Sequence, residues 1–164
     1  MTKVDPGVCR EHLQKLLTEE FNALTQLEAL LDREHELLLA NDVEGLDRAG
    51  ESRQECVGAL LRVEDERRSL CRMMNVPTDV HGLEKLLRWC DPSNTLHRRF
   101  VDCSQRATHC RELNDRNGAL VTARLKKVEG MLDVLTGRAN QPKVYGRQGM
   151  FQQPRANARV LASV

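Results

Sequence analysis

The chain has 164 residues, about the length of one domain, with 25 basic and 24 acidic side chains. Hydrophobic residues make up 40% and charged residues 30%, whereas aromatic residues make up only 3% and isoleucine is absent. This scarcity of aromatic and β-branched residues argues against a β-sheet protein. The formal net charge of +1 lacks the large basic excess usual in proteins that bind duplex nucleic acid.

Neither export nor membrane insertion is predicted. The chain has no run of eighteen apolar residues, so we expect no transmembrane helix. Its first residues lack the apolar core of a secretory signal, which favours a cytoplasmic protein without direct membrane insertion. A reducing compartment favours free, buried thiols over disulfides. The six cysteines concerned are Cys9, Cys56, Cys71, Cys90, Cys103 and Cys110.

Prolines and capping residues mark the boundaries of four predicted helices. Asp5 followed by Pro6, and Asp91 followed by Pro92, are typical of an N-cap and the first helical residue. Asp42 can cap another helix after the break in the pattern at Asn41. Between these signals, apolar residues recur at steps of three and four. The predicted helices span residues 6–40, 43–74, 79–89 and 92–135.

The predicted fold class is all-α. Because only a few residues separate the first two helices, they should form an antiparallel hairpin. A short third helix and a long, coiled-coil-like last helix follow, and a flexible C-terminal tail completes the chain. We expect a helical bundle domain over residues 1–137 and a basic, poorly ordered tail over residues 138–164.

The last helix carries a heptad seam whose middle is polar. Asn114 and Asn117 take seam positions, either as a buried layer that sets the register or as exposed residues beside a neighbouring apolar stripe. Near the end of this helix, apolar residues cover more than one face. Either the first hairpin covers that face or a partner helix does, and without a partner the helix could form a homo-oligomer.

The tail differs from the body in composition. Residues 138–164 contain five basic residues and no acidic one, which leaves 20 basic and 24 acidic residues in the body. Short apolar clusters interrupt the basic tail, a pattern that suits folding upon binding a partner. Two alternatives are packing of the tail on the oppositely charged body and binding of nucleic acid. The second is weak because the basic residues are widely spaced.

No catalytic, cofactor-binding or metal site is predicted. Asp32 and His35 have the spacing of a di-metal ligand pair, but no second such pair exists. Cys9 and His12 share a helical face without completing a four-ligand zinc set. The glycines are scattered, and no phosphate-binding loop occurs. We therefore expect a protein that is not an enzyme and that acts by recognising a partner.

Several features together resemble the FlgN family of flagellar export chaperones. They are the chain length, the leucine-rich opening hairpin, the short helix before a long last helix, and an Asn-x-x-Asn step at Asn114 and Asn117. The most specific feature lies in the tail, where residues 145–149 read YGRQG and match the family's Y-G-x-x-G element. The resemblance covers essentially the whole chain.

This resemblance implies a cytoplasmic chaperone for hook–filament junction proteins. Such chaperones bind the C-terminal helical segment of their cargo, prevent its premature polymerisation and deliver it to the type III export gate. By resemblance, the binding region is the end of the last helix together with the tail, and Tyr145 is a candidate contact for the export gate. The implied partner-binding residues are Leu125, Val128, Met131, Leu132, Leu135, Val144, Tyr145, Gly146, Gly149, Met150, Phe151, Val160 and Leu161.

The main alternative is a helical coiled-coil adaptor without a flagellar role. It would share the fold and differ in the identity of its partner. A nucleic-acid binder that acts through the basic tail would instead show affinity that falls steeply with salt.

Overall fold

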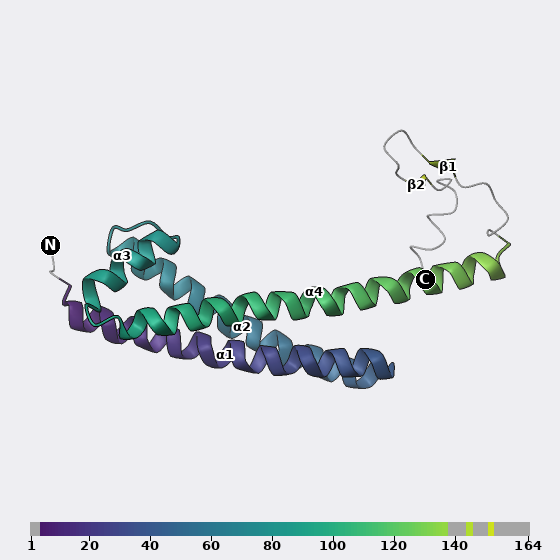
Figure 1. The fold of residues 1–164 in the computed structure, drawn as a ribbon, viewed down its shortest axis with the longest axis horizontal. Helices are drawn as coiled ribbons and strands as arrows, with labels where there is room; N and C mark the ends of the chain where they lie inside the picture. Colours follow the sequence, from purple (N-terminus) through teal and green to yellow (C-terminus); the bar gives the residue numbers. More distant parts are fainter. Residues whose placement is uncertain (1–3, 138–143, 146–150, 153–164) are drawn as a thin grey trace. The chain divides into compact units, whose positions relative to one another are not determined.

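The computed structural model describes residues 4–137, 144–145 and 151–152, and its regular elements are mostly helical (Figure 1). The predicted all-α fold with four helices is confirmed. Two compact units divide the chain, Met1–Val121 and Thr122–Val164. The elements are α1 (Pro6–Ala40), α2 (Val43–Met73), α3 (Val80–Cys90), α4 (Thr95–Leu135), β1 (Val144–Tyr145) and β2 (Phe151–Gln152).

A two-residue turn joins α1 and α2 into the predicted antiparallel hairpin (Figure 1). Asn41 adopts the left-handed conformation with φ of 58°, and its backbone N–H donates to the carbonyls that end α1. The next residue, Asp42, caps α2 by accepting a hydrogen bond from the backbone N–H of Gly45 at 3.0 Å. Asparagine tolerates positive φ and aspartate is a good N-cap, so local chemistry determines this reversal.

Leucines from all four helices form the core of the first unit. Leu13 and Leu31 of α1 are each 1% exposed, and Leu83, Leu86 and Leu87 of α3 pack into the same cluster. The helices thus bury aliphatic side chains in place of an aromatic centre. No helix among the described residues has the length and apolar character that crossing a membrane requires.

Helices α1 and α4 lie in parallel, in contact every seven residues. The thiols of Cys103 and Cys110 donate to the carbonyl oxygens of Leu17 and Leu24, both at 3.6 Å. One heptad further on, the side-chain amide of Asn117 donates to the carbonyl oxygen of Leu31 at 2.8 Å. The two alternatives for the polar layer therefore each hold for one residue, because Asn117 is buried and Asn114 is exposed.

All six cysteines are buried and free, as expected. Burial raises the pKa of Cys9 to about 12, and the neighbouring thiols of Cys90 and Cys71 act in the same direction. Burial also raises the pKa of Cys103 to about 11, with a contribution from the Glu20 carboxylate. These thiols stay protonated at neutral pH and pack as small apolar side chains.

The predicted start of the last helix at Pro92 is wrong, since α4 begins at Thr95. Residue Asn94 adopts φ of 59°, so the backbone turns between the two helices before the helical conformation resumes. Asp91 ends α3 as its C-cap. Its carboxylate still serves α4, because it accepts from the backbone N–H of Leu96 at 2.7 Å and from the Ser93 hydroxyl at 3.1 Å.

We expect replacement of Asp91 by asparagine to lower the free energy of unfolding by about 2 kcal/mol at neutral pH. The side chain is 1% exposed, and Arg10 lies 3.4 Å from it. Burial opposes its ionisation, but hydrogen bonds from Leu96, Ser93 and Arg10 outweigh burial and lower the pKa. A lowered carboxylate pKa stabilises the folded state above the ordinary value of 3.8 and does so less as pH falls.

Urea titrations across pH check this expectation. The difference between the protein and the Asp91→Asn variant should be full above about pH 4 and should shrink at lower pH. Asp102→Asn is the matched control, because Asp102 is exposed on α4. A pH-independent difference would show that the charge of Asp91 does not contribute.

Candidate partner-binding surface

The apolar end of α4 is exposed. Its five large side chains lie at helical steps that bring them to one broad face, and their exposed fractions run from 39% for Leu132 to 79% for Leu135. The buried residues of α4 end at Asn117. The alternative in which the first hairpin covers this face is therefore not what the described residues show. We call this surface the α4 stripe: Leu125, Val128, Met131, Leu132 and Leu135.

Local sequence shapes the α4 stripe. Lys126, Lys127 and Glu129 lie between the apolar positions and keep the rest of the helix polar. The helix ends at Leu135, where the Thr136 hydroxyl donates to the Leu132 carbonyl at 2.8 Å. Gly137 follows with φ of 74°, a conformation that glycine adopts at little cost. An exposed apolar face of this size on a helix is typical of a site for another protein segment.

Most of the tail residues implied as contacts fall outside the described residues. These are Gly146, Gly149, Met150, Val160 and Leu161. The backbones of Val144, Tyr145 and Phe151 belong to a two-stranded antiparallel pair, in which Tyr145 is opposite Phe151. The pair was not predicted, because two-residue strands are too short for an alternating pattern to show them.

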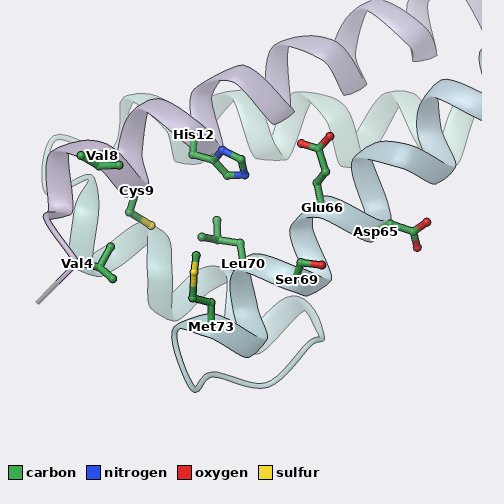
Figure 2. Close-up of a pocket in the computed structure, with 9 residues that line it drawn as sticks. All are labelled: Val4, Val8, Cys9, His12, Asp65, Glu66, Ser69, Leu70 and Met73. Carbon is green, nitrogen blue, oxygen red and sulfur yellow. The ribbon is translucent and has the colours of Figure 1, made fainter. Parts of the chain in front are cut away.

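A separate apolar hollow lies between the start of α1 and the end of α2 (Figure 2). It has a volume of about 470 Å³, and its walls include Val8, Leu70 and Met73. Asp65 and Glu66 line its acidic side and have no ion-pair partner within residues 4–137. Sequence analysis missed this hollow, because it exists only where two helix ends far apart in the chain come together.

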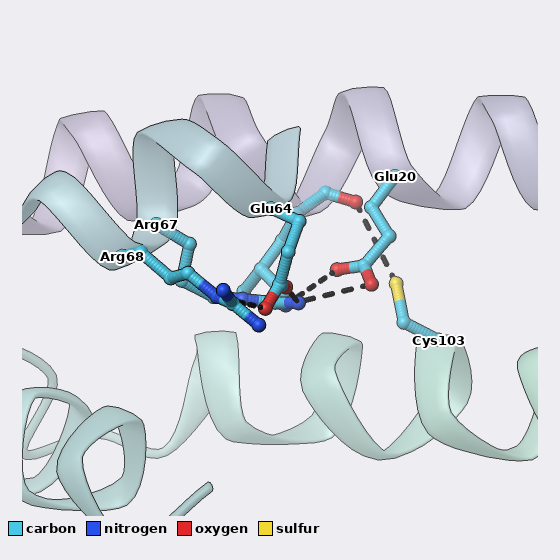
Figure 3. A network of polar contacts seen from close by, with 6 residues as sticks. Glu20, Glu64, Arg67, Arg68 and Cys103 are labelled. Atoms are coloured by element: carbon cyan, nitrogen blue, oxygen red, sulfur yellow. Dashed lines mark hydrogen bonds and ion pairs between the residues drawn. The ribbon is translucent and has the colours of Figure 1, made fainter. Parts of the chain in front are cut away.

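A network of charged residues ties α2 to α1 (Figure 3). The guanidinium of Arg67 lies 3.2 Å from the Glu20 carboxylate and also pairs with Glu64, and Glu64 lies 3.0 Å from Arg68. Burial alone would lower the pKa of Arg67, yet Glu20 and Glu64 raise it. Burial would raise the pKa of Glu64, but Arg67 and Arg68 lower it. These ionised groups compensate one another, which indicates a structural role.

Comparison with known proteins gives one match. The family model described as FlgN protein matches residues 10–153, which include nearly all of the helical part and both strands. No curated protein and no solved structure matches the chain.

Proposed function

Because the chain belongs to the FlgN family of flagellar export chaperones, we propose that it binds the C-terminal helical segment of hook–filament junction proteins in the cytoplasm. Binding would prevent premature polymerisation of the cargo before its delivery to the type III export gate. The observation that supports this proposal is the exposed α4 stripe, which offers a partner helix an apolar face.

The physical task of such a chaperone suits a helix–helix contact. A segment that polymerises through an apolar face is kept from its own kind when another helix covers that face. Release at the export gate requires that the affinity be moderate. Ordering of a basic, polar tail upon binding would lower the affinity while the contact area stays large.

The tail is the second part of the proposal. Its apolar residues would extend the cargo contact beyond the α4 stripe, and Tyr145 is the proposed contact for the export gate. A chain that ends at Gly137 separates the two contributions, because it keeps the whole α4 stripe and lacks the tail.

Calorimetric titration with the C-terminal segment of a junction protein tests the proposal. We expect the double variant Leu125→Ala/Leu132→Ala to bind about 100-fold more weakly than the unchanged chain, since each leucine buried on binding contributes roughly tenfold. Both side chains are exposed, so the variant should fold normally. The matched control is Leu39→Ala/Leu61→Ala, whose side chains are 62% and 61% exposed on α1 and α2.

Equal affinities of the stripe variant and the control would mean that the α4 stripe is not the cargo site. Absence of binding by the folded, unchanged chain would favour a helical adaptor without a flagellar role. Binding that depends on the tail and weakens steeply with salt, for nucleic acid in place of the cargo, would contradict the proposal altogether.

A further inference from the structure

A groove between α2 and α4 runs over one side of α1. Two hollows form it, with volumes of about 600 and 420 Å³, and both are lined by Ala107 and Arg111 of α4, so they are continuous. One hollow reaches Leu83 of α3 and the other reaches Asn114 of α4. We call this surface the α2–α4 groove. From Phe100 to Asn114 it follows α4 for about 20 Å, the length of nearly four helical turns.

Side chains from α1 and α2 keep the groove from closing. Arg53 of α2 reaches across it to Asn114 of α4 at 3.5 Å, while its guanidinium also lies 3.2 Å from the buried Glu34 carboxylate of α1. Arg67, near the other end, points from α2 to Glu20 of α1 (Figure 3). Long polar side chains thus span the space between the two helices.

The section of the groove near Asn114 is apolar with cationic edges. Its floor and wall include Leu27 and Leu60, which are half-buried, and Val57, which is 41% exposed. The charged residues that line this hollow are Arg53 and Arg111. Arg53 is paired with Glu34, whereas Arg111 has no ion-pair partner in the part of the chain that the structure describes. The free charge beside this apolar section is therefore positive.

We propose that the α2–α4 groove is a second docking surface for cargo, which holds an amphipathic helix with a carboxylate opposite Arg111. The apolar side chains of that helix lie against Leu27, Val57 and Leu60. Three helices already surround the groove, and a fourth would complete a bundle in which each apolar face is covered. The positive charge at Arg111 selects a helix with an acidic residue beside its apolar face. This inference rests on the proposed function and adds a site apart from the α4 stripe.

Charge reversal at Arg111 tests the inference with the same cargo segment. We expect Arg111→Glu to weaken binding at least tenfold at low salt and by less at high salt. The matched control is Arg98→Glu, which makes the same charge change at an exposed position of α4 that does not line the groove. The control should stay within twofold of the unchanged chain.

Two further measurements make the test specific. A cargo peptide whose acidic residues are replaced by their amides should bind the unchanged chain and Arg111→Glu with equal affinity. Val57→Glu places a carboxylate in the apolar section and should weaken binding at least tenfold. Its control is Val101→Glu, at an exposed valine of α4 outside the groove.

Each alternative outcome contradicts the inference in a recognisable way. If stripe variants lose affinity while groove variants keep it, the groove is not a cargo site and the proposed function stands. If sedimentation shows that Val57→Glu dissociates a dimer without affecting cargo affinity, a second copy of this chain occupies the groove. If the folded, unchanged chain binds no cargo segment, the proposed function and this inference fail together.

Discussion

Truncation of Leu31 to alanine is expected to lower the free energy of unfolding by about 3–4 kcal/mol. Leu31 is 1% exposed and lies where α1 meets α4, with its carbonyl oxygen bonded to the side chain of Asn117. The substitution leaves that backbone oxygen in place and removes only the aliphatic side chain. The cost is the lost burial together with the cavity that remains in a closely packed region.

The matched control is Leu39→Ala in the same helix. Leu39 is 62% exposed, so its truncation should change the free energy of unfolding by no more than about 0.5 kcal/mol. Both variants exchange the same side chain for the same methyl group, so differences in helix propensity largely cancel. Urea unfolding followed by circular dichroism gives both values. A cost for Leu31→Ala near that of the control would mean that α4 does not pack on α1 as described.

Replacement of Gly82 by alanine is expected to cost about 3 kcal/mol and to displace the start of α3. A Cβ atom at this position would lie 1.6 Å from the carbonyl oxygen of Pro77 and 2.6 Å from its carbonyl carbon. Both are backbone atoms, so the clash cannot be relieved by a side-chain rotation. The loop before α3 would have to move, and the cap that Asp79 forms with the backbone N–H of Gly82 would be disturbed.

Gly58→Ala is the control for the glycine exchange itself. Gly58 lies inside α2 with no atom within 4 Å of its ideal Cβ position, so alanine there should stabilise the protein by about 0.5–1 kcal/mol. The opposite signs of the two effects separate the clash from helix propensity. Trp89, the single tryptophan, lies in α3 and reports its displacement by fluorescence. A Gly82→Ala variant with unchanged stability and emission would contradict the close approach of α3 to Pro77.

The helices themselves follow from local sequence. Pro6, Asp42 and Asp79 mark helix starts, and α1 has the predicted bounds because its caps and its leucine pattern involve only nearby residues. The error at Pro92 has a tertiary cause. Asp91 is buried beside Arg10 of α1, and the turn through Asn94 lets its carboxylate cap α4 from five residues away. A local rule that expects a cap and a helix start at adjacent positions misses this arrangement.

The sequence by itself determined the helical class, the family and the apolar residues that became the α4 stripe, since periodicity and motifs depend on near neighbours. Only the tertiary structure decided which of two similar asparagines is buried. Asn117 meets the Leu31 carbonyl, and Asn114 lies three residues back on a different side of the helix. The α2–α4 groove was likewise invisible, because its residues lie on helices whose spacing depends on long-range contacts such as that of Arg53 with Asn114. Local chemistry sets where helices begin and end, whereas packing between distant segments sets which of their faces stay open.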